Sequence, residues 1–384
     1  MNIGRDVYTS RMVFLDERRR RFGRKLARRA ADRALLRFVN GMQLLMGGLT
    51  EVGDTPKDVV FQDRKLKVFR YRVREPEEVE IGTETFLIEP RSLPVPVLLV
   101  PPLMVRPYVY DLRAEHSLVR ALRRAGYDVF LVDFGVPDRE DAVVRLDDYV
   151  LDYMAKAVAA VRRETGREDL SLAGYCMGGI FCLLYTSAWD DQRVRNIVTI
   201  ASPIDFSRMG LITFLARVAN REVRFLADRI GNIPGFINSQ ALKLLAPIKR
   251  FTRYGDLFVN LWNEEYVRGF ESMSTWANDF IPFPRDAFKQ VMKEFMKDNK
   301  LIQEIHMGDR VANLRKITCS LLSFAGIDDG IATPASARVI QNLCASKDFE
   351  YVEVPGGHIG VIAGSTAPQA VWDRMATWLR PRSI

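Results

Sequence analysis

The sequence predicts an α/β protein in which helices cover both faces of a mostly parallel, doubly wound sheet. Short apolar runs have the length of buried parallel strands, at residues 95–100, 129–133, 170–173, 194–201, 321–325 and 351–354. Segments with helical spacing separate most of them, at residues 112–125, 146–165, 177–187, 335–344 and 368–379. Alternation of strand and helix along a chain is the pattern of a doubly wound sheet.

Two stretches depart from this alternation. Residues 205–311 contain no run typical of a strand and are rich in aromatic residues, Arg, Met and Asn. We expect a helical cap (lid) there, inserted into the core after the predicted strand 194–201. Ahead of the core, the alternating runs 66–73 and 84–90 predict an antiparallel hairpin. The predicted domains are a basic N-terminal segment (1–56), an α/β core (57–204 and 312–384) and the cap (205–311).

The N-terminal segment carries the charge of the whole chain. Residues 12–46 have helical spacing and end at two glycines. Between Arg18 and Arg33 there are nine Lys or Arg residues and one acid, so this run carries +8, which equals the net charge of all 384 residues. Such a helix suits an anionic surface such as phospholipid, or an acidic partner chain; a solvated helix on the main domain is an equal alternative. Nucleic acid is the least favoured partner, because no pattern of aromatic residues for base stacking accompanies the charges.

Composition excludes several other classes. The apolar stretch 95–105 is broken by prolines and is too short to span a bilayer. The first residues lack the apolar core of a secretory signal, so we expect a cytoplasmic protein. The four cysteines form no C-x-x-C pair, which argues against a zinc site or a disulfide framework and leaves a thiol free to react. No cofactor and no metal are expected.

One cysteine lies in a recognisable turn. Residues 170–179 read as a strand, the turn Gly174-Tyr175-Cys176-Met177-Gly178 and the start of a helix. This is the nucleophile elbow of the α/β-hydrolase fold, with Cys in place of Ser. The glycines let strand and helix approach closely, and the helix N-terminus favours a thiolate. The alternative is a buried structural Cys176 on a tight turn.

A cysteine nucleophile needs a base. Among three histidines, His358 follows the last predicted strand, where this fold delivers its base. His116, on a predicted helix, and His306, near the end of the cap, fit surface or packing roles.

The acid and the oxyanion hole follow from the same fold. Asp328 and Asp329 both come just after a core strand, and their positions do not separate them. Asp133 fits a loop cap better than an orienting acid. The backbone N–H groups of Met177 and of the loop near Val105 would form an oxyanion hole. The other cysteines have packing interpretations: Cys182, Cys319 and Cys344.

With these motifs in order, the sequence resembles polyhydroxyalkanoate synthases, most closely their class III catalytic subunits. The resemblance covers about residues 95–380 and rests on segments that follow one another: Arg106-Pro107-Tyr108, LVDFGVPDREDAVVRLDDYV, GYCMGG, IASPIDF, the lid-like NLWNEEYVRGFESMSTWANDFIPFPRDAFKQ with DNKLI, then GIDDGI and PGGHIGVIAGS.

The resemblance implies roles for three residues and a reaction. The family's nucleophile falls on Cys176, its histidine on His358 and its acid on Asp329, which selects Asp329 over Asp328. In the family the histidine activates the cysteine, and the aspartate is assigned to activating the incoming 3-hydroxyl. The implied substrate is a 3-hydroxyacyl-CoA, with 3-hydroxybutyryl-CoA favoured, and the product is a polyester. A separate class III partner subunit, a homo-oligomer and a granule surface are also implied.

This chain departs from the family pattern at three points. Phe134 replaces the Trp of an Asp-Trp-Gly motif, Val105 replaces an Asn, and one extra residue precedes Pro334. The Val105 change leaves a backbone N–H, not a side chain, at the oxyanion hole. Two alternatives therefore accompany the synthase: a cysteine thioesterase, esterase or depolymerase-like hydrolase, and a non-catalytic granule- or membrane-surface protein.

Overall fold

The structure, a computed structural model, describes residues 32–42, 44, 52–71, 77–81, 84–88, 92–244 and 255–384. The chain divides into two compact units, Met1–Thr50 with Ile248–Ser272, and Glu51–Pro247 with Met273–Ile384. In the described part of the chain, no helix combines the length and the apolar character that a bilayer crossing requires.

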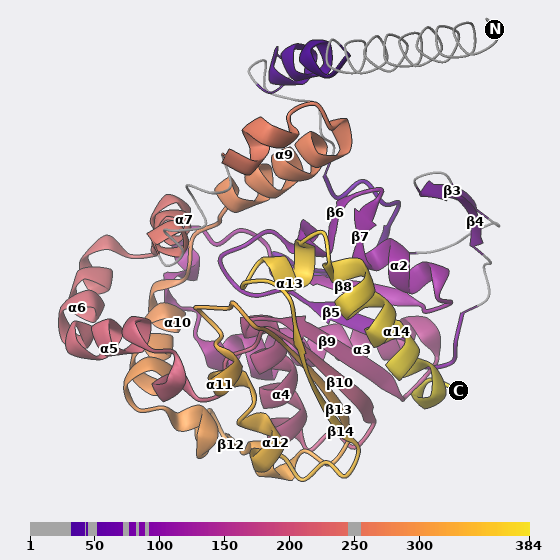
Figure 1. Cartoon of the computed structure of the whole chain (residues 1–384). Helices are drawn as coiled ribbons and strands as arrows, with labels where there is room; N and C mark the ends of the chain where they lie inside the picture. Colours follow the sequence, from indigo (N-terminus) through magenta and orange to yellow (C-terminus); the bar gives the residue numbers. More distant parts are fainter. Residues whose placement is uncertain are drawn as a thin grey trace, which may run out of the picture. The chain divides into compact units, whose positions relative to one another are not determined.

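The second unit is built on one eight-stranded sheet (Figure 1). Its spatial order is β1 (Asp58–Asp63), β2 (Leu66–Tyr71), β8 (Val129–Asp133), β5 (Val97–Val100), β9 (Leu170–Tyr175), β10 (Val194–Ile200), β13 (Ser320–Gly326) and β14 (Phe349–Val354). The six strands from β8 to β14 pair in parallel, while β1 and β2 add an antiparallel edge. All six apolar runs predicted as core strands are strands of this sheet.

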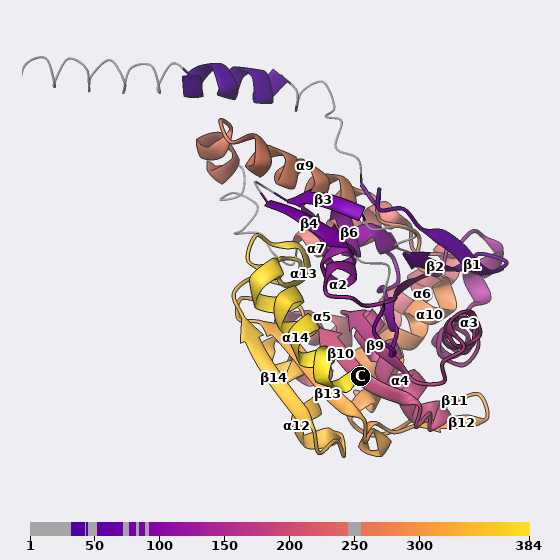
Figure 2. The same cartoon turned by 90° about the vertical axis from the view of Figure 1, so that its right-hand side faces the viewer.

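Helices pack on both faces of the sheet (Figures 1 and 2). One face carries α3 (Met154–Thr165) and α4 (Met177–Trp189), and the other carries α2 (Leu118–Arg124) and α14 (Asp373–Leu379). Strand β5 contributes side chains to the cores on both faces. Leu98 and Val100 pack on the face of α3 and α4, and Val97 and Leu99 pack on the face of α2 and α14. A strand buried on both faces must be apolar at every position, which explains the uninterrupted run VLLV.

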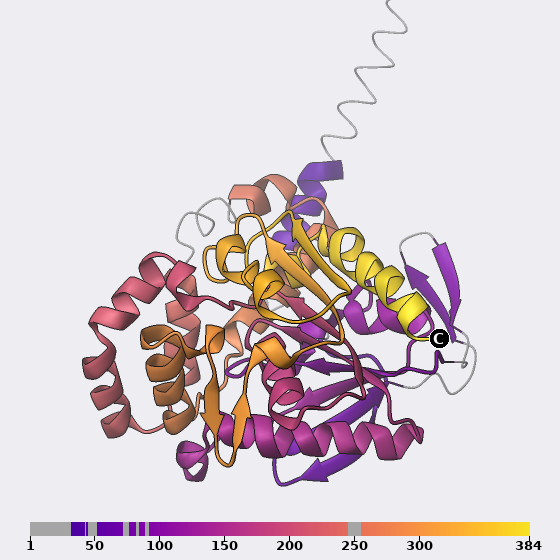
Figure 3. The same cartoon turned by 90° about the horizontal axis from the view of Figure 1, so that it is seen from below.

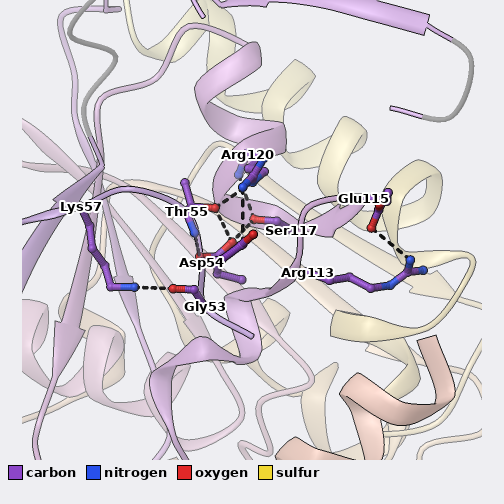
Figure 4. Close-up of polar contacts among 9 residues, drawn as sticks. Gly53, Asp54, Thr55, Lys57, Arg113, Glu115, Ser117 and Arg120 are labelled. Carbon is purple, nitrogen blue, oxygen red and sulfur yellow. Dashed lines mark hydrogen bonds and ion pairs between the residues drawn. The ribbon is translucent and has the colours of Figure 1, made fainter. Parts of the chain in front are cut away.

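The predicted helix 112–125 begins only at Leu118. Before it, β6 (Asp111–Arg113) and β7 (His116–Ser117) form a small antiparallel hairpin. The Ser117 hydroxyl caps α2 by accepting from the Arg120 N–H at 3.1 Å and donates to the buried Asp111 carboxylate at 2.6 Å. Thr55 also donates to Asp111, and Arg120 donates to Thr55 (Figure 4). Polar bonds to a buried carboxylate thus decide where this helix starts.

Other elements also differ from the prediction in their pairing or their limits. The runs 66–73 and 84–90 do not pair with each other: β2 pairs with β1, and β4 (Glu84–Ile88) pairs with β3 (Glu77–Ile81). Helix α4 (Met177–Trp189) agrees with the predicted helix 177–187. The other three predicted helices are split in two or begin with a wider turn: η3 (Asp148–Tyr153) before α3, α11 (Pro334–Ala337) and α12 (Ile340–Leu343), and η8 (Pro368–Trp372) before α14. Shorter helices are α13 (Gly360–Ala363), η1 (Pro107–Tyr110), η2 (Glu140–Val143), η4 (Phe206–Arg208), η6 (Lys300–Ile302), η7 (Leu314–Lys316) and η9 (Arg380–Arg382).

The region predicted as a cap is mainly helical. It contains α5 (Leu211–Val218), α6 (Asn220–Ile230), α7 (Gly235–Leu244), α9 (Glu264–Asn278), α10 (Arg285–Gln290) and η5 (Val291–Lys297). Figure 3 shows α5 and α6 on the side of the second unit away from α14. The expectation of no strand here was wrong, because β11 (Ile305–Met307) pairs with β12 (Arg310–Ala312). The domain limits remain a prediction.

In the first unit, residues 32–42 form a helix, as predicted for the longer range 12–46. The Asn40 amide donates to the Leu261 carbonyl at 2.7 Å, and the Arg33 guanidinium lies 4.6 Å from the centre of the Trp262 ring. These contacts join the helix to the chain just before α9. Residues 18–31, the greater part of the basic run, lie outside the described residues.

Candidate active site

Cys176 lies at a strained turn between β9 and α4. Its backbone angles, φ 53° and ψ −120°, fall in a region that residues with a side chain rarely occupy. A hydrogen bond joins this turn to the neighbouring strand, because the Cys176 N–H donates to the Ile200 carbonyl of β10 at 2.8 Å. This hydrogen bond helps to hold the strained backbone conformation. The conformation places the sulfur at the carboxyl end of β9.

The two glycines of the G-x-C-x-G turn are required by close backbone approach. A Cβ on Gly174 would lie 2.2 Å from the Gly178 carbonyl carbon. A Cβ on Gly178 would lie 2.0 Å from the Val100 carbonyl oxygen of β5. The expected close approach of strand and helix at these glycines is confirmed.

His358 and Asp329 meet beside Cys176. His358 follows β14 and Asp329 follows β13, and the His358 Nδ1 lies 2.8 Å from Asp329 Oδ2. The Cys176 sulfur lies close enough to the imidazole to help raise the pKa of His358. Because Nδ1 faces Asp329, Nε2 is the ring nitrogen left for the thiol. Thiol, imidazole and carboxylate stand in one line, each within reach of the next.

The structure separates the two neighbouring carboxylates. Asp328 is exposed, whereas Asp329 is 3% exposed. The second oxygen of Asp329 accepts the backbone N–H groups of Ile331 at 2.8 Å and Ala332 at 2.9 Å. These bonds fix the carboxylate while its first oxygen faces His358. The geometry thus pairs Asp329 with the histidine, as the resemblance implies.

The other histidines lie elsewhere. His116 is on β7, not on a helix as predicted, and its ring packs edge-on against Trp372 with 4.7 Å between centroids. Burial, reinforced by the nearby Arg113 charge, lowers the pKa of His116 to about 4, so the ring is neutral at physiological pH. His306 is exposed, 3.6 Å from Glu304. Neither takes part in the Cys176 cluster.

The remaining sequence-predicted residues have structural surroundings. Asp133 caps the turn after β8 by accepting the Gly135 N–H at 2.9 Å, and burial raises the pKa of its carboxyl group. Cys182 is fully buried, which raises the pKa of its thiol. Burial raises the pKa of Cys319 to about 12 and also raises that of Cys344. Burial thus makes these three thiols poor nucleophiles at neutral pH.

Two tyrosines of the site escaped the sequence analysis. The Tyr110 hydroxyl donates to the Val100 carbonyl at 2.7 Å and accepts the Tyr175 N–H at 2.8 Å. The Tyr175 hydroxyl in turn donates to the His358 carbonyl at 3.2 Å, and the two rings lie 5.2 Å apart. Tyr175 thus bonds Tyr110 through its backbone and His358 through its side chain, next to the Cys176 thiol. Its place inside the G-x-C-x-G motif was the only available signal.

The predicted oxyanion donors follow two neighbouring strands of the sheet, β9 and β5. Met177 is the first residue of α4, directly after Cys176, and Val105 lies in the loop that follows β5. Both residues are buried, at 7% exposure. Met104, just before Val105, has φ 65°, the left-handed region. The loop that would supply the second donor is therefore itself strained.

A small recess opens beside this loop. Its walls come from the ends of β5 and β8, from η3 and from the chain before α10: Pro101, Pro102, Leu103, Met104, Val105, Pro107, Asp133, Phe134, Gly135, Pro137, Tyr149, Ile281, Pro282 and Pro284. The Phe134 ring packs edge-on against Tyr149 and Phe181 at centroid distances of 5.2 and 5.9 Å. Val105 and Phe134, two departures from the family pattern, thus line one recess.

The electrostatics of His358 give a first prediction. Burial alone lowers the pKa of His358, but the Cys176 sulfur and the Asp329 carboxylate outweigh it and raise that pKa from 6.5 to about 10. Protonated His358 therefore stabilises the fold below about pH 6.5, and this contribution is lost as the pH rises through 10. We expect the NMR signal of His358 to titrate far above that of a model imidazole. In Cys176→Ala its pKa should fall, because the sulfur no longer favours the imidazolium; an unchanged titration would contradict this.

Comparisons with known proteins agree with this geometry. Residues 108–365 match the family model described as the alpha/beta hydrolase fold. Two solved structures share the fold: a monoglyceride lipase from Saccharomyces cerevisiae (17% identity, TM-score 0.53, 87% of this chain and 97% of that one) and a putative lipase from Sulfolobus solfataricus (18%, TM-score 0.51, 86% and 98%).

Sequence relatives narrow the family. The poly(3-hydroxyalkanoate) polymerase subunit PhaC of Allochromatium vinosum is 32% identical over 348 residues, which cover 89% of this chain and 93% of the relative. The protein of the same name from Synechocystis is 31% identical over 360 residues, 90% of each chain. That from Haloferax mediterranei is 32% identical over 337 residues, 86% of this chain and 65% of the relative. The chain therefore belongs to the poly(3-hydroxyalkanoate) polymerase family within the alpha/beta hydrolase fold.

Proposed function

We propose that this protein polymerises 3-hydroxyacyl-CoA into polyhydroxyalkanoate, releasing CoA, through a thioester on Cys176. The observation that carries the proposal is the place of His358, which bonds Asp329 through Nδ1 and interacts with the Cys176 sulfur. The relatives named above are polymerases of 3-hydroxyalkanoates, which supports the same reaction here. The CoA thioester is a substrate, and the chemistry needs no cofactor.

In the first half-reaction the thiol proton already lies on His358, whose pKa is raised, and the Cys176 thiolate attacks the thioester carbonyl. The carbonyl oxygen becomes an oxyanion, which the N–H groups of Met177 and Val105 stabilise. The intermediate collapses, the bond to the CoA sulfur breaks, and the CoA thiolate takes the proton from the His358 imidazolium. One thioester has replaced another, so the step is nearly isoenergetic and the acyl-enzyme survives until a hydroxyl arrives.

In the second half-reaction a 3-hydroxyl attacks the acyl-enzyme. The family assignment gives the activation of this hydroxyl to the aspartate. The Asp329 side chain has 0% exposure, and its oxygens are occupied by His358 and two backbone N–H groups. We infer that His358 receives the hydroxyl proton and that Asp329 orients the imidazole. The ester forms as the Cys176 thiolate leaves and recovers a proton from His358.

The proposal is tested by giving the purified protein 3-hydroxybutyryl-CoA, with and without a candidate partner subunit. CoA release together with insoluble polyester is the expected result. CoA release with free 3-hydroxybutyrate alone would replace the polymerase with a thioesterase. No CoA release under either condition would favour a surface-binding protein without catalytic activity.

The two carboxylates give a matched pair of variants. Asp329→Asn should lower CoA release about 10²- to 10⁴-fold, because an amide no longer favours the correct tautomer of His358 or its charged form. Asp328→Asn makes the same chemical change on an exposed neighbour and should leave the rate within about twofold. Steady-state kinetics of both variants, with circular dichroism as a check on folding, measures the difference. Equal effects in the two variants would remove Asp329 from its role.

Partners and location are also part of the proposal. The relatives are named as subunits, which supports a separate partner chain, and we propose that the catalytic chain forms a homo-oligomer. We further propose a cytoplasmic enzyme that the basic run between Arg18 and Arg33 attaches to the granule surface, its phospholipid or the partner subunit. Deleting residues 1–34 should release the protein from granules or from the complex; unchanged binding to both would defeat this.

A further inference from the structure

The last residues of α9 and the chain that follows them contact the loop that carries Val105. We call residues 276–281 the clamp segment. Its Ile281 N–H donates to the Met104 carbonyl at 3.0 Å, and the Trp276 Nε1–H donates to the Arg106 carbonyl at 3.2 Å. These two bonds hold the loop at the residues directly before and after Val105. Every residue involved belongs to the same compact unit.

The Ile281 bond has a direct effect on the proposed oxyanion donor. The Met104 carbonyl and the Val105 N–H belong to one planar trans peptide group and point in opposite directions. A bond that fixes the carbonyl therefore fixes the direction of the N–H. Donation to the carbonyl also polarises the peptide, which makes its N–H a better donor.

The backbone of Met104 indicates that this peptide needs such support. A non-glycine residue at φ 65° costs about 1 kcal/mol or more relative to ordinary backbone. Strain of this kind persists only where the surroundings hold it. Met104 packs against both hydrophobic cores, and its carbonyl accepts from the clamp segment.

Side chains hold the clamp segment from two directions. On the loop side, Asp279 accepts from the Tyr108 hydroxyl at 2.9 Å and pairs with Arg106 at 3.4 Å. On the cap side, the buried Asn238 and Ser239 of α7 donate to the carbonyls of Ile281 at 3.2 Å and Ala277 at 2.9 Å. A continuous series of contacts thus runs from α7 to the peptide of Val105.

We propose that Trp276, Asp279 and Ile281 are positioning residues for the oxyanion hole. They hold the Val105 N–H in the direction that a tetrahedral intermediate requires, so thioester attack is fast only while the clamp segment is seated. The cap then contributes to the chemical step and does more than exclude water. This inference rests on the proposed function, since it concerns the same acyl transfer.

Three variants of the full chain test it. Trp276→Phe removes one donor, Asp279→Ala removes the Tyr108 and Arg106 contacts, and an amide-to-ester exchange at Ile281 removes only the N–H. Single-turnover CoA release should slow about 10- to 100-fold in each. KM for 3-hydroxybutyryl-CoA should stay within about threefold. Alkylation of Cys176 by iodoacetamide should keep its rate, because displacement at a saturated carbon forms no oxyanion.

A surface variant supplies the control. Glu353 is paired with Arg338 at 2.7 Å on the exposed side of β14, and Glu353→Gln should leave both rates unchanged. Normal acylation in the Ile281 ester would overturn the proposal. A parallel loss of acylation and alkylation would also overturn it, since that pattern means a general disruption of the site. If wild-type protein releases no CoA, the proposed function fails instead.

Discussion

Replacing Cys176 with alanine should lower CoA release by more than about 10⁴-fold and abolish acyl-enzyme formation. The other three thiols cannot take over, because burial raises their pKa values. His358 would keep its bond to Asp329, yet it would have no nucleophile to activate. Mass spectrometry of the protein after mixing with 3-hydroxybutyryl-CoA, together with a CoA-release assay, measures both effects.

Cys344→Ala is the matched control for this variant. Cys344 is partly buried at the end of α12, and its loss should leave both the acyl-enzyme and the rate of CoA release intact. An acylated peptide that contains any residue other than Cys176 would show that the nucleophile has been assigned wrongly.

Replacing Gly178 with alanine should have the largest effect on stability, a loss of more than about 4 kcal/mol in the free energy of unfolding. The added methyl group would lie 2.0 Å from the Val100 carbonyl oxygen, which belongs to backbone and cannot rotate away. Helix α4 would have to move off β5. We expect insoluble expression or a chemical denaturation midpoint far below that of wild type.

Gly255→Ala tests whether any glycine change would do the same. Among the described residues, no atom lies within 4 Å of a Cβ placed at Gly255, and the residue lies in a helical stretch. This variant should be as stable as wild type or slightly more so, because alanine favours helix. A Gly178→Ala protein of wild-type stability would mean that the elbow is packed less tightly than described.

The sequence predicted the parts of the fold that depend on local pattern. The six core strands were found because each contains a short apolar run, as expected for strands that a protein core covers. Cys176 was found because its turn needs two glycines at fixed offsets. His358 was found by elimination among three histidines and by its place after the last strand.

What escaped prediction depends on contacts between distant residues. The start of α2 at Leu118 depends on a buried carboxylate that also binds Thr55, some sixty residues earlier. Burial distinguishes Asp329 from Asp328, and burial comes from the folded loop, not from the carboxylates themselves. The clamp segment holds Met104 through a backbone N–H, which every residue except proline possesses. The residue types at these positions therefore could not predict that bond.

The recess beside the Val105 loop changes how this chain's sequence divergence should be counted. Val105 and Phe134 face the same space, so the two departures are one coupled adjustment of a single wall. Where an amide and an indole are usual, this chain has an isopropyl group and a smaller ring, which leaves that wall less polar and less bulky. Neighbouring replacements of this kind are not additive. Restoring the residue of the family pattern at one position alone would leave a mismatched wall. Experiments on this recess should therefore vary both positions together.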